Sequence, residues 1–101
     1  MTTAIIHHPV FFEHDTGPHH PETPSRYSVV IDALRRDAEL WQKLKEVEAQ
    51  EAPRGDIQAA HTPQLYKQIE RVVSEGTGYL DSDTVVSMRS MDAAKRAAGA
   101  P

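Results

Sequence analysis

The sequence predicts an α/β fold with a parallel sheet, and three observations support this prediction. The apolar run at residues 4–6 (AII) has the length of a short buried strand. Several stretches with helical periodicity follow it, and alternating strands and helices are typical of parallel sheets. Only one or two strands are recognisable, although a parallel sheet needs several strands covered on both faces. We therefore expect an incomplete sheet, the N-terminal part of a larger α/β domain, with no internal boundary in residues 1–101.

A stiff loop and then a helix are predicted after the first strand. Residues 14–24 contain three prolines and one glycine, which disfavour regular structure. Thr23 can cap a helix in which Pro24 takes the first position. The buried stripe of this helix is expected at Tyr27, Val30, Ile31 and Leu34.

The middle of the chain predicts two more helices. The first spans residues 37–47, and residues 48–54 after it are ambiguous, with a short strand allowed. The second begins at Thr62 and Pro63 and ends at Gly76. Their apolar sides are expected at Leu40, Trp41, Leu44 and Val47 in the first helix, and at Leu65, Ile69, Val72 and Val73 in the second.

Residues 76–87 are expected to form a loop, followed by a last helix rich in alanine. Ser87 or Ser90 can cap this helix, and its alanines suit close packing. Gly99 stands where a left-handed residue is expected to end the helix.

The composition narrows the class of protein. Hydrophobic residues make up 39% and charged residues 26%, which is typical of a folded globular chain. The formal net charge of -4 provides no basic surface, so we expect no nucleic-acid partner. No apolar run approaches the roughly 20 residues that cross a bilayer, so we expect no membrane partner. The absence of cysteine excludes disulfides and fits a cytoplasmic location.

Two polar clusters could bind a cation. The first consists of potential metal ligands in and before the loop, but no pair among them has a fixed helical spacing; they are His7, His8, His14, Asp15, His19, His20 and Glu22. A rigid surface loop with side chains that bond nearby backbone groups explains this cluster as well. The second cluster, Asp81 and Asp83, either binds calcium or accepts backbone hydrogen bonds in a loop.

Arg26 is a further candidate, since it lies in the first turn of a helix, where a cation opposes the macrodipole. It is either a structural clamp for the proline-rich loop or a functional cation. No serine or histidine pattern in the chain predicts a nucleophile with an adjacent base.

Three segments, taken together, resemble the histone deacetylase superfamily, which includes acetoin-utilisation proteins and acetylpolyamine amidohydrolases. Residues 14–18 (HDTGP) and 20–26 (HPETPSR) resemble its first loop, H-D-x-G-x-G-H-P-E-x-P-x-R. Residues 60–66 (AHTPQLY) resemble its V-H-(S/T)-x-x-Y segment, and residues 79–99 resemble its D-x-D-T…S…A-A…A-A-G segment. His19 departs from the pattern, because the family commonly has glycine there.

The resemblance implies an arginase–deacetylase-type fold and zinc-dependent hydrolysis of acetyl-lysine or acetylpolyamine. In the family the zinc ligands, the catalytic histidine pair and the transition-state tyrosine follow the region that this chain matches. The resemblance therefore implies that this chain has no catalytic residue, no metal ligand and no cofactor. It implies that full-length members of the family bind zinc. It implies that Asp83, Glu22 and His20 bind substrate at the pocket rim and that Arg26 lines an internal channel.

Three functional hypotheses follow. The chain is the N-terminal part of a zinc-dependent deacetylase, inactive alone, whose partner is the C-terminal remainder of the domain. Alternatively it is a non-catalytic interaction module that self-associates through an uncovered sheet edge. The third is a small metal-binding protein built on the histidine-rich loop.

Overall fold

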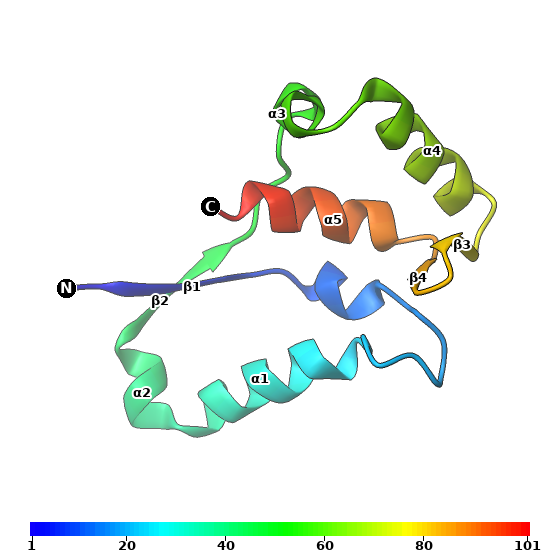
Figure 1. The fold of residues 1–101 in the computed structure, drawn as a ribbon. Coiled ribbons are helices and arrows are strands. Elements are labelled where there is room, and N and C mark those ends of the chain that lie inside the picture. Colours follow the sequence, from blue (N-terminus) through cyan, green and yellow to red (C-terminus); the bar gives the residue numbers. More distant parts are fainter.

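A computed structural model describes residues 1–101, which form helices, a parallel pair of strands and, at one edge of the molecule, a β-hairpin (Figure 1). The elements in chain order are β1 (Thr3–His7), the 3-10 helix η1 (Pro9–Glu13), α1 (Ser25–Arg36), α2 (Ala38–Gln42), β2 (Leu44–Glu48), α3 (Arg54–Ala60), α4 (Pro63–Ser74), β3 (Gly78–Asp81), β4 (Thr84–Val86) and α5 (Ser90–Gly99). None of these helices is long and apolar enough to span a bilayer.

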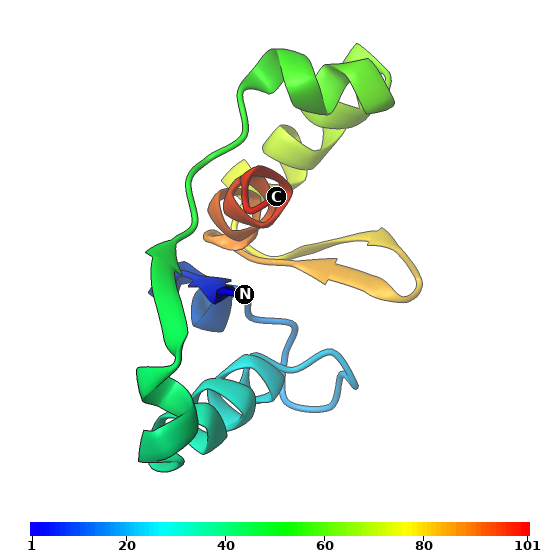
Figure 2. The ribbon, with the colours of Figure 1, turned by 90° about the vertical axis from the view of Figure 1, so that its left-hand side faces the viewer.

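The first sheet pairs β1 with β2 in parallel, in a register that runs from Thr3 opposite Leu44 to His7 opposite Glu48. Helices α1 and α2 form the crossover between the two strands. In two perpendicular views β1 and η1 lie between α1 and α5 (Figures 1 and 2). The predicted α/β class with a parallel sheet is confirmed, and so is the strand at residues 4–6.

The second strand lies where the sequence predicted a helix. Helix α2 stops at Gln42, and residues 44–48 form β2 instead of extending a helix to Val47. The i, i+3 spacing of Leu44 and Val47 favours a helix, and pairing with β1 overrides this local pattern in favour of the strand. The strand allowed at residues 48–54 is wrong, since β2 ends at Glu48 and α3, which was not predicted, begins at Arg54.

A hairpin replaces the loop predicted at residues 76–87. Strands β3 and β4 pair in antiparallel fashion, with an irregular register between Tyr79 and Asp81. The connection between them lacks the Asn-Gly or Asp-Gly pair that signals a tight hairpin. Gly76 ends α4 as predicted, with a φ of 103°.

The two Thr-Pro pairs behave differently. Thr62 caps α4, because its side chain accepts from the backbone N–H of Leu65 at 3.2 Å. Thr23 does not cap α1, because its hydroxyl forms a hydrogen bond with the hydroxyl of Ser25 at 2.6 Å. A Thr-Pro pair therefore marks the start of both α1 and α4, but its threonine forms the capping hydrogen bond only in α4.

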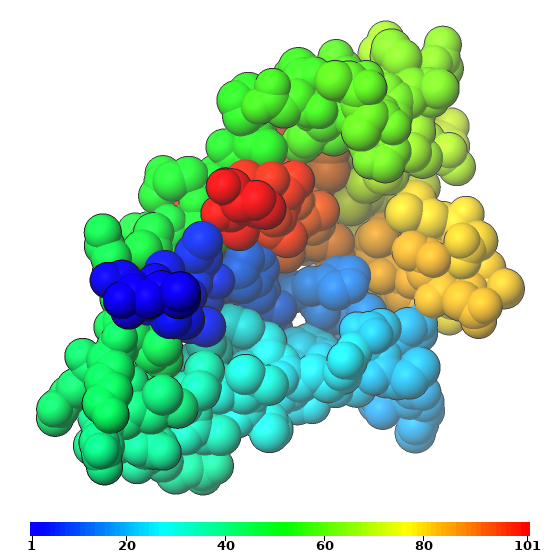
Figure 3. Space-filling view, turned by 60° about the vertical axis from the view of Figure 1, so that its left-hand side comes forward, coloured from blue at the N-terminus to red at the C-terminus, as the bar shows by residue number.

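The core is small and discontinuous. Twelve of the 101 residues are buried, and the molecule extends 45 × 33 × 17 Å. The radius of gyration of 15.3 Å exceeds the roughly 13 Å of a compact domain of this length. In α1, Ile31 is buried as predicted, whereas Val30 is 55% exposed. In the space-filling view the blue N-terminal strand lies between the cyan α1 and the red α5 (Figure 3).

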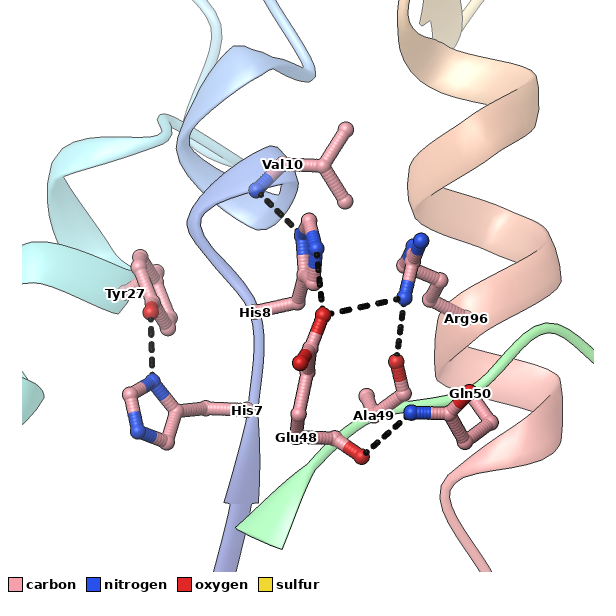
Figure 4. Close-up of polar contacts among 8 residues, drawn as sticks. All are labelled: His7, His8, Val10, Tyr27, Glu48, Ala49, Gln50 and Arg96. Carbon is pink, nitrogen blue, oxygen red and sulfur yellow. Dashed lines mark hydrogen bonds and ion pairs between the residues drawn. The ribbon is translucent and has the colours of Figure 1, made fainter. Parts of the chain in front are cut away.

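Paired histidines and carboxylates join β1 to β2. His7 contacts Glu46 through Nε2 at 2.7 Å and the hydroxyl of Tyr27 through Nδ1 at 2.9 Å. His8 pairs with Glu48 at 3.4 Å on the other side of the strand (Figure 4). The hydrogen bond from His7 holds the pKa of Glu46 below its usual range, and burial raises the pKa of Tyr27.

Helix α5 approaches the backbone after β2 closely. The N–H of Ala52 donates to the carbonyl of Lys95 at 2.9 Å, and Arg96 donates to the carbonyl of Ala49 at 2.6 Å (Figure 4). Gly99 is the last residue of α5, and the left-handed conformation predicted for it is wrong. Glycine is needed there for space, since a Cβ would lie 2.0 Å from the carbonyl oxygen of Gln50.

We predict that Gly99→Ala destabilises the protein although alanine favours helix. The added methyl forces the segment after β2 away from α5, which costs about 1–3 kcal/mol, more than the gain of about 1 kcal/mol in helix propensity. Gly55→Ala in α3 is the matched control, because its Cβ meets no atom within 4 Å. Chemical denaturation measures both, and an equal gain in stability for the two variants would contradict the close approach.

Candidate functional site: a pocket between the first loop and the hairpin

A cavity of about 570 Å³ lies between the proline-rich loop and the β3–β4 hairpin. Residues 16–22 form one wall, and the hairpin forms the other with Tyr79, Ser82, Asp83 and Val85. Most of the lining residues are polar, glycine or proline, and Tyr79 and Val85 are the hydrophobic ones among them. Segments more than 50 positions apart in sequence therefore share one site.

Hydrogen bonds within the loop fix the first wall. Gly17 has a φ of 89°, and its N–H donates to the carboxylate of Asp15 at 2.9 Å. Thr16 is buried and donates through its hydroxyl to the carbonyl of Glu22 at 2.6 Å. These bonds close the loop on itself and satisfy backbone groups that the prolines leave without regular partners.

The loop is also tied to the start of α5 by a polar cluster that sequence reasoning did not identify. The N–H of Asp15 donates to the buried hydroxyl of Ser87 at 3.0 Å. His14 contacts the hydroxyl of Ser90 at 2.6 Å, and this hydroxyl accepts from the N–H of Ser87 at 2.7 Å. The two serines thus hold the loop instead of capping α5, whose N-cap is Arg89 without a side-chain bond.

A turn that Asp81 stabilises forms the second wall. Its carboxylate accepts from the N–H of Asp83 at 2.9 Å. This bond, together with one from Thr84, holds the pKa of Asp81 below its usual range. The interpretation of Asp81 as an acceptor of backbone hydrogen bonds is thus confirmed. Asp83 lines the cavity, and its carboxylate takes part in no hydrogen bond or ion pair.

The structure brings three of the four predicted site residues together. His20, Glu22 and Asp83 all line the cavity, and His20 donates from Nε2 to the carbonyl of Asp83 at 2.7 Å. Arg26 does not line it. Its side chain is 64% exposed and forms an ion pair with Glu22, so in this structure it clamps the loop.

The candidate metal ligands are dispersed. His7 and His8 pair with carboxylates of β2, His14 contacts Ser90, and His20 contacts the hairpin. Nowhere do three or more histidine, aspartate or glutamate side chains gather in a way that could hold a metal ion. The residues of this chain therefore do not fit a zinc site, and we assign no metal-dependent step to them.

We predict that the amide resonance of Asp83 follows the titration of Asp81. Because the folded pKa of Asp81 is lowered, its contribution to hairpin stability is complete above the ordinary aspartate value of about 3.9 and is lost as the pH falls through the lower, folded value. NMR titration of the amide should give a midpoint below about 3.9. Asp81→Asn removes this step and Asp56→Asn, in α3, keeps it; a midpoint at or above 3.9 in the wild type would contradict the bond.

Comparisons with known proteins agree on one family. The family model of the histone deacetylase domain matches residues 20–101. The uncharacterized protein slr0245 of Synechocystis sp. is 36% identical over 98 residues, an alignment that covers 93% of this chain and 32% of that protein. The crystal structure of the HDA15 HD domain matches 98% of this chain and 30% of its own, with a TM-score of 0.84 and 22% identity.

This chain therefore spans about a third of the length of the relatives that it matches. The structural match, at 22% identity, shows that this chain shares the fold of part of the HDA15 HD domain. The family model covers most of the chain. It includes the hairpin wall of the pocket and residues 20–22 of the loop wall. The chain belongs to the histone deacetylase family.

Proposed function

We propose that this chain supplies the pocket rim of a zinc-dependent deacetylase that hydrolyses acetyl-lysine or acetylpolyamine. The observation that carries the proposal is the cavity in which His20 and Glu22 face Asp83 across two distant segments. Membership of the family supports the reaction class, and the cavity supports a role in holding substrate.

Asp83 is the substrate-binding group in this proposal. Its backbone is fixed on both sides, since its N–H is bound by Asp81 and its carbonyl by His20. Its carboxylate is exposed and takes part in no hydrogen bond. A fixed, unpaired carboxylate suits the amide N–H groups that flank an acetylated lysine, because charge-assisted hydrogen bonds are stronger than neutral ones.

Glu22 connects this rim to Arg26, which does not itself line the cavity. Glu22 lines the cavity while pairing with Arg26 one helical turn later, so the pair presents little net charge to a ligand. In this proposal Arg26 borders the internal channel, and Glu22 orients its guanidinium. In this proposal no residue of the chain performs the bond-breaking step.

We predict no turnover by the purified 101-residue chain. Acetyl-lysine peptide and acetylpolyamine are incubated with the chain and added zinc, and the released acetate is measured. The proposal assigns the zinc ligands and the catalytic histidine pair to the part of the domain that this chain does not match. Acetate release above that of a zinc-only control would contradict the assignment of this chain to the rim.

Binding at the rim is measured separately, by NMR titration with an acetyl-lysine peptide. Shift changes are expected at His20, Glu22 and Asp83. Asp83→Asn should weaken binding about tenfold, since a hydrogen bond to a charged group contributes about 1.5–3 kcal/mol. Asp56→Asn removes an equal charge from α3 and should leave binding unchanged; equal effects of the two variants would indicate a general charge effect.

The second candidate function is a non-catalytic module that self-associates. It is favoured by apolar side chains on the surface of α1, where Val29 is 62% and Val30 55% exposed, and by a two-stranded sheet with unpaired outer edges. Burial of such a surface in a second copy would stabilise both chains.

For this candidate we predict a molar mass that rises with concentration in light scattering. Val30→Glu should lower the association, because a buried carboxylate without a partner opposes it. Ser25→Glu, at the exposed start of the same helix, should not. A monomer at every concentration, with cooperative unfolding, would contradict self-association.

A further inference from the structure

One imidazole ring connects the two walls of the pocket. The contact of His20 with Asp83 is the single hydrogen bond between residues 16–22 and the β3–β4 hairpin. The same ring also binds its own loop, where Nδ1 accepts from the N–H of Glu22 at 3.0 Å. His20 therefore contacts the backbone of both of the pocket residues that carry a carboxylate.

The two bonds define the protonation state of the ring. Because Nδ1 accepts a hydrogen bond from the backbone N–H of Glu22, it carries no hydrogen, and the hydrogen of the neutral ring lies on Nε2. From there it donates to the carbonyl of Asp83 at 2.7 Å. Both nitrogens are thus used within the chain, and neither remains for a substrate.

The backbone on each side of this ring is held a second time. At Asp83 the N–H is bound by Asp81, so the ring and Asp81 together leave mainly the side-chain torsions of Asp83 free. At Glu22 the carbonyl accepts from Thr16, so the ring and Thr16 fix that peptide as well. Loss of the ring would leave each wall closed on itself, with the two segments joined only outside the cavity, where Asp15 bonds to Ser87.

We propose that His20 is a positioning residue, whose neutral Nε2–H tautomer sets the distance and angle between the carboxylate of Asp83 and the loop at Glu22. The use of this arrangement by a substrate rests on the proposed function, whereas the connection itself does not. The residue acts through Asp83, and its neighbour His19, which also lines the cavity, forms no hydrogen bond.

Two substitutions separate the two bonds. In His20→Gln the side-chain amide nitrogen reaches the position of Nε2 and can still donate to Asp83, but the acceptor for Glu22 is lost. In His20→Asn the amide oxygen replaces Nδ1 and can accept from Glu22, but the donor to Asp83 is lost. His19→Gln is the matched control at the adjacent exposed histidine.

Amide exchange in the isolated chain, followed by NMR, tests the connection. His20→Gln should accelerate exchange at the amide of Glu22 by roughly 2- to 10-fold, because Nδ1 is the acceptor of that N–H. His20→Asn should leave this exchange unchanged and instead shift the 13C resonance of the Asp83 carbonyl, which loses its donor. The 15N shifts of the wild-type ring should show a protonated Nε2 and an unprotonated Nδ1. The opposite tautomer, or the same Asp83 carbonyl shift in His20→Asn and His19→Gln, would overturn the proposal.

Titration with the acetyl-lysine peptide then tests the positioning. His20→Gln should bind the peptide within twofold of the wild type, and His20→Asn roughly 2- to 10-fold more weakly. Equal binding by these two variants would overturn the positioning role. A wild-type chain that shows the expected ring shifts but binds no peptide would contradict the proposed function, while the connection between the walls would stand.

Discussion

The parallel pairing of β1 with β2 is the constraint on which the other features depend. It sets His7 opposite Glu48 and makes α1 and α2 a crossover. Directly after β2, the N–H of Ala49 donates to the carbonyl of His7, and the N–H of Ala52 donates to the carbonyl of Lys95 in α5. Helix α5 therefore lies on the opposite side of β1 from α1. Because the proline-rich loop leaves from β1 and η1 while the hairpin leads into α5, this pairing brings the two walls of the pocket together.

Backbone geometry, more than charge, defines the pocket. Local hydrogen bonds hold both walls, as at Thr16, Asp81 and His20. The carboxylate of Asp83 forms no such bond and projects from a turn whose main chain is held at both ends. A binding group of this kind is presented with little conformational freedom left to lose.

The sequence predicted a helix or strand correctly where the local pattern of residues had only one structural interpretation. Thr62 and Pro63 predicted α4, and the apolar run at residues 4–6 predicted β1. It was insufficient where pairing with a distant segment decides, as for β2 and the hairpin. The resemblance singled out His20, Glu22 and Asp83, which the fold brings to one cavity, whereas Tyr79 and Val85 enter the lining only through the unpredicted hairpin.

His7, the last residue of β1, and the adjacent His8 bear on the register in which β1 pairs with β2. His7 points to Tyr27 and His8 to the Glu48–Arg96 side, so each of the two faces of the strand carries its own ionisable contact. A shift of the β1–β2 register by one residue would exchange these two faces. It would separate both His7 and His8 from their carboxylate partners. In this strand of five residues, the polar contacts therefore favour a single register with β2.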